Sequence, residues 1–218
     1  GISGNWVAVA SSANGEKLVA LNKGLQIYTS TDSGVNWTAR ATNRQWNSVA
    51  SSSDGTKLVA TVDGGLIYTS TDSGVNWTEQ SNSVVASWRS VASSADGTKL
   101  VAVVLNGQIY TSTDSGVNWT ARDSSRQWMT AASSADGTRL AATEKNGKIY
   151  TSTNSGVTWT ARDSNRGWWS IASSADGTKL VAGIETGQIY TSVGTLAAFS
   201  VELLEDAGAQ SIASVARS

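Results

Sequence analysis

The chain contains no cysteine, no histidine and no proline. Without cysteine, disulfides, thiolate metal sites and cysteine nucleophiles are excluded. Without histidine, a Ser-His-Asp triad and an imidazole-ligated zinc site are excluded as well. The absence of proline leaves a backbone N–H donor at every position, which suits a protein built from sheets. We therefore predict neither a metal nor any other cofactor.

Charge of one sign and long hydrophobic runs are also missing. Sixteen Lys and Arg side chains stand against seventeen Asp and Glu, so the formal net charge is -1. This balance gives no long-range attraction for a polyanion, and we predict no nucleic-acid partner. No apolar stretch approaches the roughly 20 residues that cross a bilayer, and no signal-peptide pattern opens the chain. We expect a soluble protein without a membrane partner, and leave open a secreted or cell-surface location.

The chain is built from five copies of one unit of about 40 residues. The same tryptophan and the same tyrosine recur with spacings of 40, 42, 40 and 40 residues. The tryptophans are Trp6, Trp46, Trp88, Trp128 and Trp168, and the tyrosines are Tyr28, Tyr68, Tyr110, Tyr150 and Tyr190. A period of this length indicates a repeat architecture, in which each unit buries its hydrophobic faces against its neighbours.

Each unit contains four strand-sized runs separated by turn residues. In the third unit the runs are WRSVASS, KLVAVV, QIYTS and VNWTAR. The turns between them are Asp96-Gly97, Asn106-Gly107 and Asp114-Ser115-Gly116. Runs rich in Val, Ile, Thr, Tyr and Trp between such turns predict a meander of four antiparallel strands.

Four strands in about 40 residues are typical of one blade of a β-propeller. A single meander cannot bury both of its faces, so neighbouring units must pack face to face. We predict an all-β protein, a five-bladed β-propeller of four-stranded blades that closes into one ring and forms a single domain over residues 1–218. The predicted blades, called repeats 1 to 5 below, are approximately 5–45, 46–87, 88–127, 128–167 and 168–206, followed by a terminal strand or tail at 207–218.

The third turn of each repeat carries the most specific motif. STDSGVNW occurs at 30–37, 70–77 and 112–119, and STNSGVTW at 152–159. These four stretches, the box turns, resemble the Asp-box or BNR repeat of sialidase-type propellers, with Asn36, Asn76 and Asn118 where that pattern has Thr or Ser. We expect a structural role, because an Asp or Asn can accept backbone N–H groups and Gly can take a positive φ. The residues concerned are Ser30, Asp32, Gly34, Trp37, Ser70, Asp72, Gly74, Trp77, Ser112, Asp114, Gly116, Trp119, Ser152, Asn154, Gly156 and Trp159.

The resemblance implies which residues a catalytic member would need. Sialidases use three arginines on the substrate carboxylate, a tyrosine activated by a glutamate, and an acidic aspartate. In this chain no tyrosine lies in a linker between repeats, and Asp63, Glu144 and Glu185 are scattered over second turns. We therefore predict no catalytic residues and no enzyme, with a sialidase-type glycoside hydrolase as the least favoured alternative. All five tyrosines are expected to serve packing.

Differences between the repeats gather on one predicted face. The first turns and the box turns are nearly uniform, whereas the second turns and the linkers vary. Because successive strands alternate in direction, second turns and linkers lie on the same side. The position after the first-strand tryptophan varies most, as Val7, Asn47, Arg89, Met129 and Trp169.

These varying positions suggest a ligand site. Arginine can grip a carboxylate or sulfate and an exposed indole can stack on a sugar ring, so we expect a non-catalytic propeller that binds an anionic or neutral glycan. The alternative for the arginines is that they are solvated or pair with Asp123 and Asp163. The alternative function is a scaffold, recently amplified or engineered, with no ligand of its own. The candidate binding residues are Arg44, Asn47, Arg89, Arg126, Met129, Arg166 and Trp169.

The last repeat is irregular. TSVGTLAAFSVE replaces a box turn and places Phe199 where repeat 4 has Trp159. Further on, residues 211–214 repeat the SIAS of 170–173, which suggests a further strand. This strand could cap a sheet edge, begin another blade, or mediate self-association between chains.

Overall fold

The structure is a computed structural model that describes residues 3–192 and the backbone of 201–204. This part of the chain is all β, and it contains no helix long and apolar enough to cross a bilayer. The strands are β1 (Trp6–Ser11), β2 (Leu18–Asn22), β3 (Ile27–Ser30), β4 (Thr38–Arg40), β5 (Trp46–Ser51), β6 (Leu58–Gly65), β7 (Ile67–Ser70), β8 (Thr78–Gln80), β9 (Ala86–Ser93), β10 (Leu100–Ser112), β11 (Thr120–Ser133), β12 (Leu140–Ser152), β13 (Thr160–Ser173), β14 (Leu180–Ile184), β15 (Ile189–Ser192) and β16 (Val201–Leu204).

All strand pairs are antiparallel, and the first two repeats show the predicted four separate strands. In repeats 3 and 4 the strands are longer than predicted: β10 covers the second and third runs of repeat 3, and β11 joins its fourth run to the first run of repeat 4. The reason is that the second turn itself pairs with the following linker, through Leu105 with Gln127 and Gly107 with Arg126. Ladder pairing therefore continues through segments that the sequence marks as loops.

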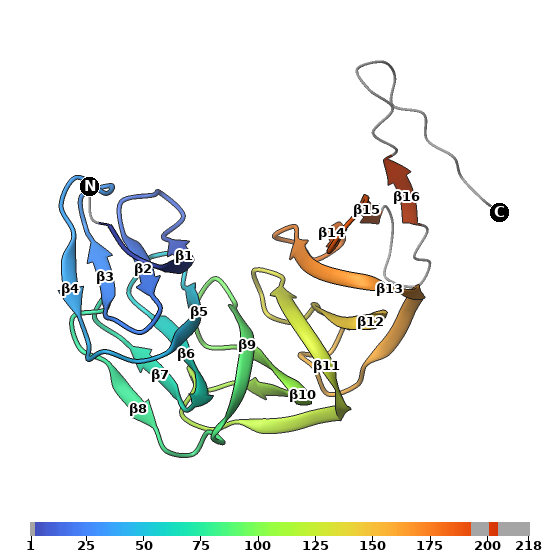
Figure 1. Cartoon of the computed structure of the whole chain (residues 1–218), viewed down its shortest axis with the longest axis horizontal. Helices are drawn as coiled ribbons and strands as arrows, with labels where there is room; N and C mark the ends of the chain where they lie inside the picture. The colour runs from blue at the N-terminus through green and yellow to red at the C-terminus, as the bar shows by residue number, and fades with distance from the viewer. Residues whose placement is uncertain (1–2, 193–200, 205–218) are drawn as a thin grey trace.

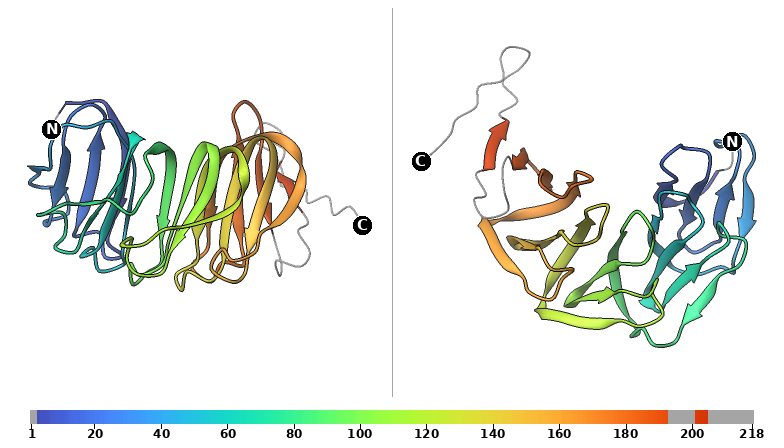
Figure 2. Two further views of the ribbon diagram at one scale, coloured as in Figure 1. Left: turned by 90° about the horizontal axis from the view of Figure 1, so that it is seen from below. Right: turned by 180° about the vertical axis from the view of Figure 1, so that it is seen from behind.

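The repeats lie next to one another in an arc (Figures 1 and 2). Their first strands line its concave side and contact in order: β1 with β5, β5 with β9, β9 with β11, and β11 with β13. Within the described residues no comparable contact joins β13 to β1, and Figure 1 shows a gap between the two ends of the arc. The closed ring of five is therefore not formed by this part of the chain. The predictions for Phe199 and for 207–218 lie outside the described residues.

The core lies between the repeats, because each repeat packs two different faces against its neighbours. The face with the recurring tryptophan, here the tryptophan face, carries Trp46 and Val49 in repeat 2. It packs against the opposite, aliphatic face of repeat 1, formed by Val19, Leu21 and Ile27. The tryptophan side chains of repeats 2 to 5 are all 0% exposed. Interlocking of unlike faces therefore holds the arc together.

The tyrosines pack as predicted. In every repeat the tyrosine ring meets the first-strand tryptophan edge-on, with ring centroids 5.0 to 5.3 Å apart. Edge-to-face contact is a favourable arrangement for aromatic pairs.

The box turns have the hydrogen bonds that a structural role requires. In the first, Ser30 Oγ donates to Asp32 Oδ1 at 2.7 Å and accepts the Gly34 N–H at 2.9 Å. Asp32 Oδ1 also accepts the backbone N–H of Asn36, at 2.9 Å, and Trp37 Nε1 donates to the Gly34 carbonyl at 3.0 Å. Gly34 has a φ of 86°. In the fourth turn the Asn154 amide oxygen accepts the Thr158 N–H at 2.9 Å, as expected for its replacement of Asp.

Candidate functional site

The most variable position of the repeat is a β-bulge. In all five repeats the pairing of first and second strand slips by one residue just after the tryptophan, as between Trp168 and Ser170. A bulged residue is left out of the ladder, and bulges often re-aim a side chain next to a binding site. This explains why the position tolerates different side chains, which are Val7, Asn47, Arg89, Met129 and Trp169.

The bulged side chains have different surroundings. Asn47 Nδ2 donates to the Trp88 carbonyl at 2.7 Å and so ties repeat 2 to repeat 3. Met129 is buried, with 5% of its surface exposed. Arg89 is half-buried, and its guanidinium makes no ion pair within the part of the chain that the structure describes. Trp169, in contrast, is 41% exposed.

The three linker arginines are stacked on the tyrosine of the following repeat. The guanidinium carbon of Arg44 lies 4.6 Å from the Tyr68 ring centroid. The Arg126 to Tyr150 and Arg166 to Tyr190 distances are both 4.7 Å. A guanidinium over an aromatic face is attracted by the ring quadrupole. These arginines therefore share one repeated packing role.

Each linker arginine also has a carboxylate neighbour. Arg166 Nε lies 3.8 Å from Asp163 Oδ2, which matches the pairing alternative for this linker. Arg126 instead faces Glu144, at 3.9 Å, and Arg44 faces Glu79, also at 3.9 Å. Because their charges are already compensated, these arginines have less to offer an anionic ligand than three free guanidinium groups would.

Repeat 2 contains a tyrosine–carboxylate pair, in which the Tyr68 hydroxyl donates a hydrogen bond to Glu79. Burial and this hydrogen bond raise the pKa of Tyr68 to about 12. Burial and the nearby Glu144 carboxylate raise the pKa of Tyr150 in the same way. A raised pKa disfavours the phenolate, so both hydroxyls are protonated at neutral pH.

A polar groove opens on the face of second turns and linkers, between repeats 3 and 4. Its volume is about 510 Å³, and amide, hydroxyl and charged groups line it. The second turns contribute Asn106 and Asn146, which are exposed. The remaining lining residues are Ser125, Arg126, Gln127, Glu144 and Lys145.

Trp169 contacts one residue that lines this groove. Lys145, one of the lining residues, has its Nζ 5.6 Å from the centroid of the Trp169 ring and 3.9 Å from Glu185. Of the predicted site residues, Arg126 lines the groove, and Trp169 contacts its lining residue Lys145. Asn106, Gln127, Lys145 and Asn146 were not singled out from the sequence, although they belong to the varying second turns and linkers.

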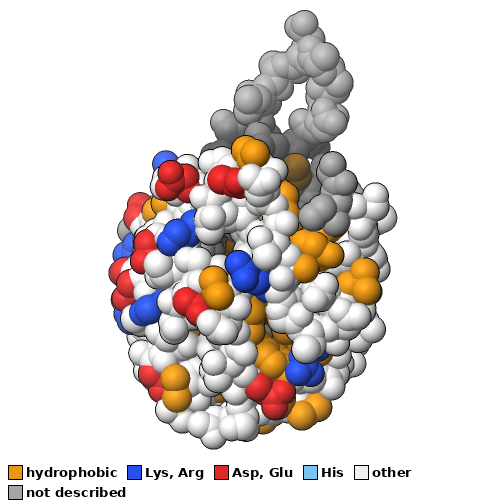
Figure 3. Space-filling view, turned by 90° about the vertical axis from the view of Figure 1, so that its left-hand side faces the viewer, with side chains coloured by type: hydrophobic (Ala, Val, Ile, Leu, Met, Phe, Trp, Pro, Cys, Tyr) orange, Lys and Arg blue, Asp and Glu red, His pale blue; other side chains and the backbone are white. Residues whose placement is uncertain are grey.

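Neither charged side chains of one sign (Figure 3) nor metal-ligating side chains cluster elsewhere among the described residues. On the face shown in Figure 3, Lys and Arg side chains are interspersed with Asp and Glu. Among residues 3–192 there is no group of three or more His, Cys, Asp or Glu side chains that could hold a metal ion.

The arrangement of strands can be compared with known proteins. No protein-family model matches the sequence, nor does any curated protein. Solved structures do match: the propeller domain of Swd1 from Myceliophteria thermophila has a TM-score of 0.73 at 13% identity, over 93% of this chain and 72% of that one. YCF48 from Cyanidioschyzon merolae has a TM-score of 0.72 at 15% identity, over 94% and 74%. The fold is that of a β-propeller.

A GH74 enzyme from Niastella koreensis resembles this propeller at a TM-score of 0.68 and 26% identity, over 87% of this chain. The chain spans only 30% of that enzyme, 33% of an ancestral GH74 enzyme, and 65% of YCF48 bound to a D1 peptide. Enzymes and binding proteins share the fold, so a function for this propeller must be argued from its site.

Proposed function

We propose that this propeller is a non-catalytic glycan-binding module, whose site is the groove between repeats 3 and 4 together with Trp169. The observation that carries the proposal is an exposed indole, 41% accessible, in contact with Lys145 of a groove that three side-chain amides help to line. Aromatic faces stack on sugar rings, and amides supply both donors and acceptors for sugar hydroxyls. The bulge provides the means to turn Trp169 out of the sheet.

A neutral glycan fits this site better than an anionic one. Arg44, Arg126 and Arg166 are stacked on tyrosines and lie within 4 Å of carboxylates. The groove itself holds a carboxylate, Glu144, and its cation Lys145 is shared with Glu185. The site therefore has no surplus positive charge for an acidic sugar.

We also propose that the framework is a sialidase-like Asp-box propeller of five four-stranded blades. The four box turns support this assignment, since each has the serine, acid or amide, glycine and tryptophan hydrogen bonds that the motif requires. In the three Asp turns Oδ1 accepts a backbone N–H and Oδ2 accepts the side-chain amide of the asparagine four residues on, so these oxygens are occupied within the turn and the turns serve structure.

The test is a glycan array followed by calorimetric titration of the best neutral oligosaccharide. Wild type should bind, and Trp169→Ala should weaken binding about tenfold or more, which corresponds to about 1.4 kcal/mol. Trp6→Ala is the matched control, because Trp6 is 37% exposed but belongs to the tryptophan face of repeat 1. It should leave the affinity unchanged.

Three results would contradict the proposal. Wild type that binds no glycan would favour the scaffold alternative, to which the near-identical repeats point. Equal affinities for wild type and Trp169→Ala would place the site elsewhere. Shorter saccharides released from the bound glycan, followed by chromatography, would show a hydrolase.

A further inference from the structure

The contacts between neighbouring repeats recur as a fixed set. One member joins the glycine of a box turn to a threonine of the preceding repeat. A Cβ on Gly74 would lie 2.6 Å from Thr29 Cγ2, and Gly116 and Gly156 stand in the same relation to Thr69 and Thr111. Only glycine allows this close approach, and the three threonines are buried.

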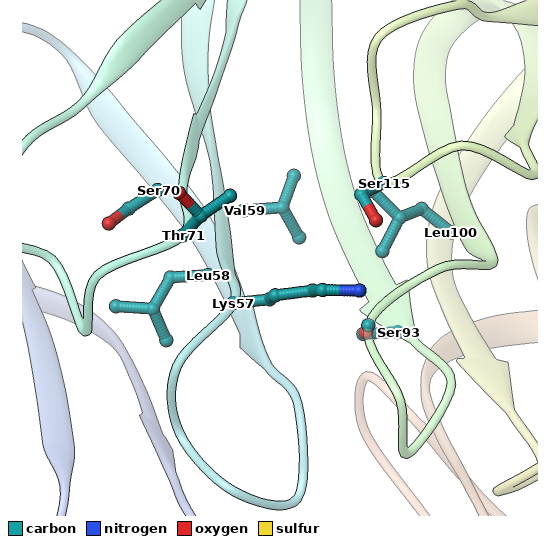
Figure 4. A pocket seen from close by; sticks show the side chains of 9 residues that line it. Lys57, Leu58, Val59, Ser70, Thr71, Ser93, Leu100 and Ser115 are labelled. Carbon is teal, nitrogen blue, oxygen red and sulfur yellow. The ribbon is translucent and has the colours of Figure 1, made fainter.

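A second contact joins the first turns. A Cβ on Gly97 would lie 2.8 Å from Lys57 Cβ, so the lysine stem of one repeat covers the first-turn glycine of the next. Figure 4 shows this interface: Lys57 of repeat 2 extends to Ser93 of repeat 3, beside Val59 and Leu100. The pair recurs as Gly55 with Lys17, Gly137 with Lys99, and Gly177 with Arg139.

A third contact is a row of backbone hydrogen bonds along the same edge. Ala13 N donates to Ser53 O, Ser53 N to Ala95 O, Ala95 N to Ala135 O, and Ala135 N to Ala175 O, each at 2.7 Å. Within the described residues the row stops at both ends, with the carbonyl of Ala13 and the N–H of Ala175.

At the first repeat the tryptophan face has no neighbouring repeat packed on it in the part of the chain that the structure describes. Val9 is 73% exposed, whereas its counterparts Val49 and Val91 are 8% and 5% exposed. A Cβ on Gly15 would meet nothing within 4 Å, and the atoms nearest to one on Gly34 belong to Leu18 and Trp37 of its own repeat. A groove of about 580 Å³ follows this face, lined by Trp6, Val9, Ala20, Gly34, Val35, Asn36 and Trp37.

At the fifth repeat no described residue of a neighbouring repeat covers the aliphatic face. Ile189 is 55% exposed, whereas its counterparts in repeats 1 to 4 are at most 1% exposed. Val181 is 41% exposed, and its counterpart Val59 is 2% exposed. The two open faces are thus the unlike halves of an interface that the chain already forms between its own repeats.

We propose that these two faces bind each other between two copies of the chain, head to tail. Figure 1 shows the two ends of the arc apart, so the described part of one chain does not bring its own two faces together. In the docked pair Thr191 of one copy packs on Gly34 of the other, Lys179 covers Gly15, and the Ala175 N–H donates to the Ala13 carbonyl. The interface is heterologous, so assemblies either close into a ring or grow.

Light scattering after size-exclusion chromatography tests the proposal over a wide range of concentrations. Wild type should show a mass above that of one chain that rises with concentration. Val9→Asp and Ile189→Asp, which each place a carboxylate in one face, should each be monomeric. Val85→Asp is the control, since Val85 is 71% exposed in the linker between repeats 2 and 3, and it should assemble like wild type.

Mixing the two blocked variants gives the sharper result. Val9→Asp keeps an intact aliphatic face and Ile189→Asp an intact tryptophan face, so the mixture should form a complex of two chains and nothing larger. A monomeric wild type would overturn the proposal, as would assembly of either single variant or a mixture that stays monomeric while near-UV circular dichroism shows folded chains. Glycan binding is measured separately, so failure here leaves the proposed function standing.

Discussion

The indole of Trp88 meets the ring of Tyr110 edge-on, with ring centroids 5.2 Å apart and ring planes at 67°. Trp88 Nε1 also donates to the carbonyl of Gly65 in the preceding repeat, at 3.1 Å. One side chain therefore links its own sheet to the neighbouring one. Because it is 0% exposed, all of its apolar surface is removed from water.

We predict that Trp88→Ala lowers the free energy of unfolding by about 3 to 5 kcal/mol, the usual cost of removing a buried large aromatic side chain. Trp6→Ala makes the same chemical change at the 37% exposed counterpart in repeat 1 and should cost less. Denaturant unfolding followed by circular dichroism gives both values. Equal losses would show that packing between repeats contributes little.

Ser112→Ala tests the box turns. Ser112 is 3% exposed, and its Oγ accepts the Gly116 N–H at 2.9 Å. Without it a buried donor is left unsatisfied, and we expect a loss of about 1 to 3 kcal/mol in urea unfolding. Ser81→Ala, at an exposed position outside the box turns, should change stability by less than about 0.5 kcal/mol. If the two variants lost similar amounts of unfolding free energy, the box turn would have no structural role.

Stability should fall in acid because of the first-turn aspartates. Hydrogen bonds from the Ser52 hydroxyl and the Thr56 N–H lower the pKa of Asp54 to about 2, and Ser94 and Thr98 do the same for Asp96. Folded-state pKa values below the ordinary 3.8 mean that the carboxylate form stabilises the fold. This contribution is complete above the unfolded pKa and is lost as the pH falls toward 2.

The measurement is the urea midpoint as a function of pH. It should decrease from about pH 4 downward, and Asp96→Asn should make the decrease shallower because the amide does not titrate there. A midpoint that is flat across this range, or an unchanged slope in Asp96→Asn, would contradict the assignment.

Arg44→Ala should affect stability more than glycan binding. Arg44 lies over Tyr68 and 3.9 Å from Glu79, and a partly exposed contact of this kind contributes about 0.5 to 1 kcal/mol. Arg89→Ala removes an arginine with no ion pair in the described part of the chain, so it is the control and should leave unfolding unchanged. If Arg44→Ala abolished glycan binding without loss of stability, the arginine would belong to the site.

The repeat period and its turns were sufficient to predict the all-β propeller fold, because turn residues such as Asp96-Gly97 and the box turns specify local geometry directly. The long strands β10 to β13 were not predictable, since the pairing of Leu105 with Gln127 joins segments that each look like loops. Closure was not predictable either, because it depends on small rotations summed over five interfaces.

The candidate site was predicted in part. Differences between the repeats predict the variable face and Trp169, but they do not predict the groove, because Asn106, Gln127 and Lys145 come from different turns and linkers. The contacts and burial of each bulged side chain could not be predicted from the sequence either. Asn47 and Met129 occupy equivalent positions, yet one bonds a neighbouring backbone and the other is buried.

The central claim is that ligands bind on the face of second turns and linkers, while the box turns on the other face serve structure. The most direct measurement is an NMR titration with a neutral oligosaccharide that follows tryptophan indole and asparagine side-chain amide signals. We predict shifts in the Trp169 indole and in the amides of Asn106 and Asn146, with those of Asn36, Asn76 and Asn118 unmoved. Shifts confined to the box-turn asparagines would contradict the account.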